Sequence, residues 1–130
     1  MNASRLLQLA EHLETGELGH EKFFFGSFTA GERNPDRYNC GTVGCAIGEC
    51  PAVWPGEWEF KNLMPVLRDA GELEDSLNCA ERFFDINGPE MLALFCPGEG
   101  LSCIPPIGSD ATRHEVAARI RAFVRWKEEQ

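Results

Sequence analysis

The stretch Asn39-Cys-Gly-Thr-Val-Gly-Cys-Ala-Ile-Gly-Glu-Cys-Pro51 holds three of the six cysteines and three of the thirteen glycines in the chain. Asn39 or Thr42 can cap a helix that begins near Val43, because both side chains can accept a hydrogen bond from a free backbone N–H group. Pro51 is expected to end that helix, since the residue before a proline disfavours helical geometry. The stretch therefore predicts a short helix in the middle of the chain.

A helix through this stretch has two different faces. At about 100° per residue, one face is apolar and the other consists of small residues. The apolar face holds Val43, Ala46, Ile47 and Cys50, and the opposite face holds Gly44, Cys45 and Gly48. Glycine costs about 1 kcal/mol relative to alanine inside a helix, so close packing must compensate. We expect both faces to be buried at the centre of the fold.

Apolar residues at helical spacing predict two longer helices, one near each end of the chain. The first spans residues 4–14. The last begins at Ser109 or Asp110 and includes Thr112-x-x-Glu115, which resembles a capping box. The inward positions are Leu6, Leu9, Ala10 and Leu13 in the first helix, and Val116, Ile120, Phe123 and Val124 in the last.

Three further helices are expected between the central stretch and the last helix. One covers residues 63–70, with Pro65 in its first turn, where a missing N–H group is harmless. The second begins at Asp75 or Ser76, and the third ends before Pro97. Their apolar residues are Leu63, Met64, Leu67 and Ala70, then Leu77, Ala80 and Phe84, then Met91, Leu92, Leu94 and Phe95.

The remaining segments predict connections. Residues 20–30, with four phenylalanines, have no clean period and are interpreted as a short extended segment or loop. Residues 31–38 and 98–108 carry loop residues such as proline and glycine. The predicted fold class is therefore mainly α: a single irregular all-α domain, residues 1–130, of five or six short helices with long loops.

Composition narrows the class of function. The net charge of −9 disfavours binding to nucleic acid, because phosphate backbones are also negative. The sequence has no apolar run of the ~20 residues that span a bilayer, so no membrane association is expected. The residues from Met1 to Glu14 lack the apolar core of a signal peptide. We expect a cytoplasmic protein with free cysteines, since the cytosol is reducing.

One hypothesis for chemistry is a cysteine nucleophile. Cys40 lies at the start of the predicted central helix, where free N–H groups and the helix dipole favour a thiolate. A histidine would have to reach its sulfur. The candidate bases are His12, His20 and His114, and His114 is the one assigned to the site. The structural alternative is that Cys40 is a half-buried apolar residue.

A second hypothesis is a zinc-stabilised domain. Cys40, Cys45 and Cys50 are five residues apart, and on a helix they do not converge on one ion. Cys96 and Cys103 flank a Pro-Gly loop and can approach each other. No metal ligand and no cofactor is assigned, because buried cysteines in a small core explain the same pattern.

Three groups of residues could form surfaces. A basic line on the last helix could meet a phosphate or an acidic partner, and an aromatic group could form a ledge. A third group is acidic and is interpreted as solvating charge in a turn. The basic line is His114, Arg121 and Arg125; the aromatic group is Trp54, Trp58 and Phe60; the acidic group is Glu72, Glu74 and Asp75. A solvated helix face and core filling are the simpler interpretations of the first two.

The central segment from Asn39 to Gly48 contains the pattern C-G-T-x-x-C-x-x-G. With Phe83-Phe84, Leu94-Phe95 and the helix after Thr112, it resembles a group of small proteins from bacteria and their phages. Gly44 stands where that group more often has alanine. The resemblance implies an all-α fold and no catalytic residue.

These observations favour a non-enzymatic module that acts through a protein partner or through self-association, for example as a homodimer. The sequence has a surplus of aromatic residues and no strong catalytic or phosphate-binding motif. The alternatives are a cysteine-dependent enzyme that uses Cys40, with His114 as its base, and a zinc-stabilised structural domain.

Overall fold

The computed structural model describes residues 1–17, 22–23, 43–44, 46–61, 64–108 and 111–130. These residues form five α-helices and a small antiparallel hairpin, so the predicted mainly helical class is confirmed. The helices are α1 (Ala3–Thr15), α2 (Cys50–Val53), α3 (Ser76–Phe84), α4 (Gly88–Phe95) and α5 (Arg113–Glu128). The strands are β1 (Lys22–Phe23), β2 (Val43–Gly44), β3 (Trp58–Lys61) and β4 (Met64–Leu67). None of the helices in these ranges is long and apolar enough to cross a membrane.

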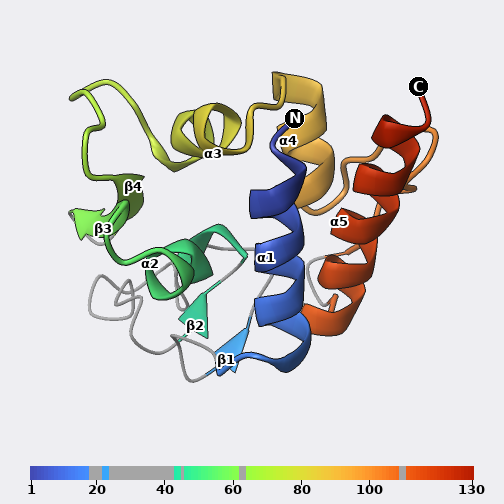
Figure 1. Ribbon diagram of the computed structural model, residues 1–130, viewed down its shortest axis with the longest axis horizontal. Helices are drawn as coiled ribbons and strands as arrows, with labels where there is room; N and C mark the ends of the chain where they lie inside the picture. Colours follow the sequence, from blue (N-terminus) through green and yellow to red (C-terminus); the bar gives the residue numbers. More distant parts are fainter. Residues whose placement is uncertain (18–21, 24–42, 45, 62–63, 109–110) are drawn as a thin grey trace.

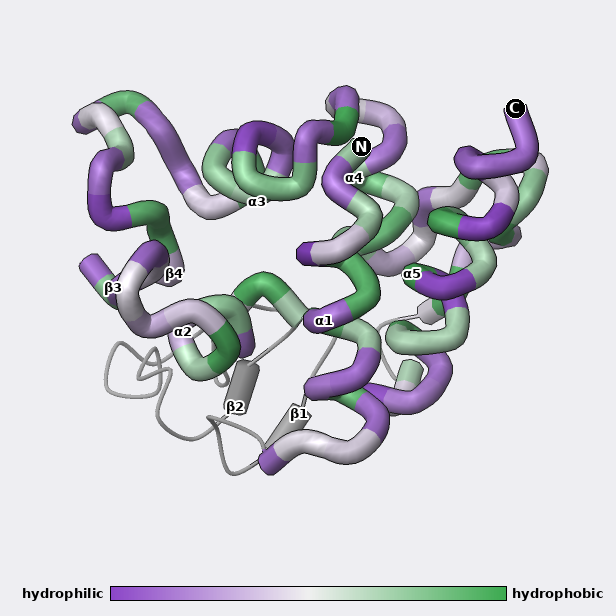
Figure 2. Tube along the Cα trace, viewed as in Figure 1, coloured by the Kyte–Doolittle hydropathy of each residue, from purple (hydrophilic) through white to green (hydrophobic). Residues whose placement is uncertain are grey.

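The first and last helices lie side by side and run in opposite directions (Figure 1). Their predicted inward residues are all buried, which confirms both helices, although α5 begins at Arg113 and not at the predicted Ser109 or Asp110. Asn2 caps α1, and Thr112 and Glu115 form the predicted capping box of α5. Hydrophobic and hydrophilic positions recur along both helices in Figure 2, as expected for helices with one buried face.

The central stretch is not the helix that its spacing predicts. Val43–Gly44 forms strand β2, which pairs in parallel with β1, and a 3₁₀ turn follows at Ile47–Glu49. Helix α2 then begins at Cys50, with Pro51 in its first turn. Proline fits this position, because the N–H group it lacks has no helical partner there. Pro51 therefore begins a helix where the sequence predicts that it ends one.

Burial of the central stretch is confirmed from Ala46 to Cys50. Ala46, Ile47, Glu49 and Cys50 are all 0% exposed, and Gly48 is buried beside them. Cys45 lies outside the described residues. The stretch packs against α1 and the hairpin, so it occupies the middle of the fold as expected.

The predicted helix over residues 63–70 is wrong. Met64–Leu67 is strand β4, which pairs with β3 in the register Trp58↔Leu67 and Lys61↔Met64. A short apolar run does not distinguish a strand from a helix, and contacts with α3 favour the strand. The hydroxyl of Ser76 donates to the carbonyl of Pro65 at 2.6 Å, and the N–H group of Leu67 donates to the sulfur of Cys79 at 3.4 Å. Asn62 and Leu63 lie outside the described residues.

The helix expected from Asp75 or Ser76 and the helix expected to end before Pro97 are confirmed, and each has a complete capping box. Asp75 pairs with Asn78 at the start of α3, and Asn87 pairs with Glu90 at the start of α4. An aromatic cluster joins these helices to α2 and β3. Its ring pairs are Trp54–Phe83 at 4.8 Å, Trp58–Phe83 at 5.4 Å, Phe83–Phe84 at 5.1 Å and Phe84–Phe95 at 5.6 Å.

One buried acidic residue connects α1 to the central stretch. The carboxylate of Glu49 is 0% exposed, and its Oε1 lies 2.8 Å from Nε2 of His12, which is 15% exposed. A buried carboxylate is costly unless polar groups surround it. The contact with His12 therefore fixes α1 against the 3₁₀ turn.

Replacing His12 by alanine is expected to lower the free energy of unfolding by roughly 2–4 kcal/mol, because it takes a polar partner from a buried carboxylate. Chemical denaturation measures the change. Glu11→Ala, at the exposed neighbouring position of α1, is the control and should change stability by less than about 0.5 kcal/mol. Equal stability of the two variants would show that the contact contributes nothing.

A second ion pair, between Glu90 and Lys127, makes the stability of the fold depend on pH. Burial raises the pKa of Glu90, but hydrogen bonds from Lys127, at 2.6 Å, and from the N–H group of Asn87 outweigh burial and lower it below 4.5. The charged form therefore stabilises the fold above that value, and this contribution is lost as the pH falls through the lower, folded-state pKa.

We expect the stability advantage of the natural protein over Glu90→Gln to shrink between about pH 6 and about pH 3. Glutamine is a suitable replacement because it can keep the capping box. Denaturation curves of both proteins at several pH values measure the difference. A difference that stays constant over this range contradicts the assignment.

Candidate binding site

The proposed catalytic pair cannot be assembled from the described residues. Cys40 and His20 lie outside them. His114 is exposed in the first turn of α5, and His12 is bound to Glu49. The hypothesis of a Cys40 nucleophile with His114 as its base therefore stays a prediction.

The described cysteines have the character of core or partly buried thiols. Cys50 and Cys79 are buried, and Cys96 and Cys103 are half-buried. Burial raises the pKa of Cys79 and of Cys96, and Glu99 raises that of Cys96 further. Within the described ranges, no group of three or more His, Cys, Asp or Glu side chains could hold a metal ion.

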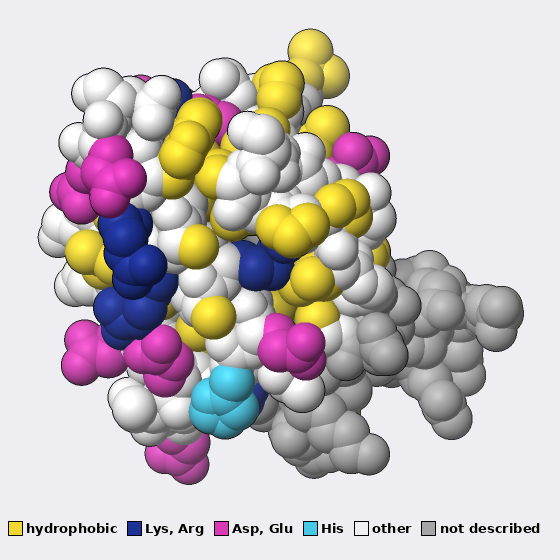
Figure 3. Space-filling view, turned by 90° about the vertical axis from the view of Figure 1, so that its right-hand side faces the viewer, with side chains coloured by type: hydrophobic (Ala, Val, Ile, Leu, Met, Phe, Trp, Pro, Cys, Tyr) yellow, Lys and Arg dark blue, Asp and Glu magenta, His cyan; other side chains and the backbone are white. Residues whose placement is uncertain are grey.

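The predicted basic line on α5 is partly neutralised by α1. Arg121 donates two hydrogen bonds to the carboxylate of Glu14, at 2.7 and 2.8 Å. These bonds raise the pKa of Arg121 and lower that of Glu14. Figure 3, which looks onto the α5 side, shows a short column of basic side chains bordered by acidic ones. This face is therefore mixed in charge.

A different arginine of α5 is buried. Arg119 is 7% exposed, and its guanidinium donates to the backbone carbonyls of Ala93, Glu99 and Pro105. Burial lowers the pKa of Arg119, and the nearby thiol of Cys103 opposes that effect. Because all three acceptors are backbone atoms, the side chain holds the loop after α4 against α5.

The aromatic group divides between core and surface. Trp58 is 1% exposed and Trp54 is half-buried against Phe83 and Phe84, so core filling is the correct interpretation for these two. Phe60 is 44% exposed. The aromatic residues of β3 therefore do not form one exposed ledge.

The register of the hairpin creates a groove that the sequence analysis did not foresee. Side chains alternate between the two faces of a strand, so the buried Trp58 and Leu67 share the inner face of the hairpin. The outer face holds Glu59, Lys61, Met64 and Val66. The turn at residues 70–75 runs along that face and forms the opposite wall.

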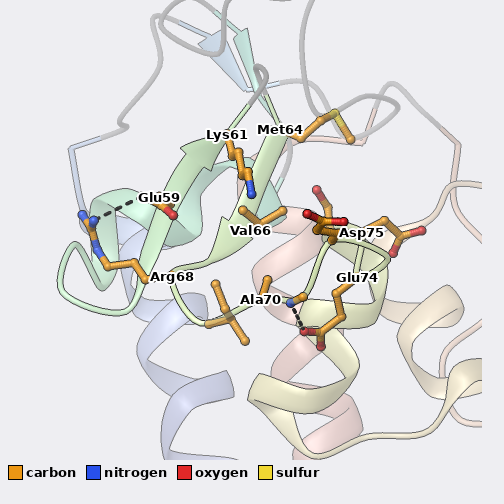
Figure 4. Close-up of a pocket in the computed structure, with 12 residues that line it drawn as sticks. Glu59, Lys61, Met64, Val66, Arg68, Ala70, Glu74 and Asp75 are labelled. Carbon is orange, nitrogen blue, oxygen red and sulfur yellow. Dashed lines mark hydrogen bonds and ion pairs between the residues drawn. The ribbon is translucent and has the colours of Figure 1, made fainter.

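The groove has an apolar floor and a charged rim. Met64, Val66 and Ala70 supply the apolar surface. In Figure 4 the side chains of Lys61 and Val66 point into the space between the hairpin and the turn, and Glu74 and Asp75 lie across from them. An apolar floor with polar groups at its edge is a common form of binding site.

The charges of the rim are held in pairs. Arg68 lies 3.3 Å from Glu59 across the hairpin. Arg82 binds Asp69 at 3.0 Å and Glu74 at 2.8 Å, so it connects the two ends of the turn. Its hydrogen bonds lower the pKa of both carboxyl groups. Glu74 and Asp75 are thus structural residues in the turn and its helix cap, beyond the solvating role expected for them.

Leu73 lies at the tip of this turn and is 98% exposed. It is followed by Glu74, whose carboxylate accepts a hydrogen bond from the N–H group of Gly71 at 3.2 Å. The signal in the sequence was a single leucine among the acidic residues from Glu72 to Asp75.

Comparison with known proteins adds no relative. No family model, curated protein or solved structure matches the chain.

Proposed function

We propose that this protein is a non-enzymatic, cytoplasmic interaction module that binds another protein through the groove between the β3–β4 hairpin and the turn at residues 70–75. The proposal involves no cofactor, nucleic acid or membrane. The observation that carries it is Leu73, which is 98% exposed on the turn between Glu72 and Glu74, two residues that line the groove. Apolar surface that lies together and is rimmed by polar groups is typical of a docking site.

The rigidity of the turn supports the proposal. Arg82 holds both Asp69 and Glu74, and the backbone N–H group of Glu74 donates to the carbonyl of Gly71 at 3.1 Å. These bonds fix the segment on both sides of Leu73. A turn whose backbone is already held in place loses less entropy on binding than a free loop does, so more of its contact energy contributes to affinity.

The position of the groove also suits a binding surface. Its floor residues belong to the hairpin, whose other face is anchored by the buried Trp58 and Leu67. Its second wall continues into α3, which contacts β4. Both walls are therefore attached to the core.

A random peptide library displayed on phage and selected against the natural protein tests this function. We expect enriched peptides whose affinity falls about 10-fold or more in Leu73→Glu, because a buried leucine contact is lost and a charge is added. Leu73 is almost fully exposed, so the substitution should leave the circular dichroism spectrum unchanged.

Leu92→Glu is the matched control, since Leu92 is another exposed leucine, 36% exposed, on α4. The enriched peptides should bind this variant as they bind the natural protein. A selection that enriches no peptide, or peptides that bind Leu73→Glu undiminished, would refute the proposed function.

A further inference from the structure

We infer that the segment that docks in this groove is basic with an apolar anchor, and that it belongs to another protein and not to a second copy of this chain. The inference rests on the proposed function and specifies the chemistry of its partner.

The first argument is the part of the rim charge that ion pairs within the protein do not neutralise. The groove is lined by four carboxylate residues and two cationic residues. Arg68 is matched by Glu59, and Glu74 is matched by Arg82 outside the lining. That leaves the carboxylate of Glu72, and the carboxylate of Asp75 that also accepts a hydrogen bond from the N–H group of Asn78 at the start of α3, opposite the ammonium group of Lys61. Glu72 is exposed on the same turn as Leu73.

The second argument is the charge of the whole chain. The chain as a whole carries a net charge of −9. This charge attracts a basic segment from a distance and repels an acidic one. Lysine or arginine side chains of the partner can approach Glu72 while an apolar side chain contacts Leu73 on the same turn.

The third argument concerns a second copy of the chain. In a symmetric dimer through this groove, the same patch lies on both sides of the interface. Because the lining holds four carboxylate and two cationic residues, each copy would bring a patch of net negative charge against the same patch of the other. Like charges brought together at an interface oppose association. The exposed Leu73 therefore favours a partner whose charge is opposite to that of the rim.

The test uses the peptides selected against the natural protein, sorted by whether they need Leu73. We expect the Leu73-dependent peptides to carry a mean net charge at least about 2 units more positive than the unselected library. Their affinity should fall by about 3-fold or more in Glu72→Lys and as salt rises from about 50 to about 500 mM. Glu129→Lys, which makes the same charge change at the exposed end of α5, should have no effect.

Each result has one meaning. Leu73-dependent peptides that are neutral or acidic, or that bind Glu72→Lys undiminished, overturn this inference and leave the proposed function intact. An absence of Leu73-dependent peptides overturns both. Light scattering measures the oligomeric state, and we expect a monomer. A dimer that Leu73→Glu abolishes would identify the occupant of the groove as a second copy of the chain. That result would also overturn the inference.

Discussion

The hydrogen bonds from arginine side chains of α5 to the backbone and side chains of other elements hold the described fold together. Arg113 donates to the carbonyls of His12, Leu13 and Gly16 at the end of α1, where the helix leaves such groups without partners. Arg119 does the same for the loop after α4, and Arg121 binds Glu14. Guanidinium suits this role because it presents several donors in a fixed plane. Helix α5 thereby fixes α1 and the loop after α4 in one arrangement.

The rest of the structure follows from where α1 is placed. Its His12 contacts the buried Glu49, which positions the central stretch. Helix α2 follows the central 3₁₀ turn directly in the chain, and Trp54 at its end packs against Phe83 of α3. The hairpin completes this layer, with Trp58 and Leu67 buried on its inner face. Among the residues that the structure describes, the turn at residues 70–75 lies along its outer face, and the groove forms between the two.

Local patterns in the sequence predicted the parts of the fold that local interactions determine. The two long helices have amphipathic spacing and caps that act within four residues, so their buried faces were predicted correctly. The hairpin and the 3₁₀ turn depend on contacts with α1 and α3, which a short apolar run does not reveal. The pair of His12 and Glu49 is separated by 37 residues. The groove could not be predicted either, since it depends on the strand register of a segment that was interpreted as a helix.

The rates of amide hydrogen exchange under native conditions test the central role of the α1–α5 pair most directly. If α5 holds the fold through α1, the buried turns of both helices should exchange at the same slowest rate, which corresponds to global unfolding. In Arg113→Met, which keeps an apolar stem, protection of the last turn of α1 should fall more than protection of α4. Exchange in α1 that is much faster than in α5 in the natural protein, or protection of α1 that is unchanged in Arg113→Met, would contradict this account.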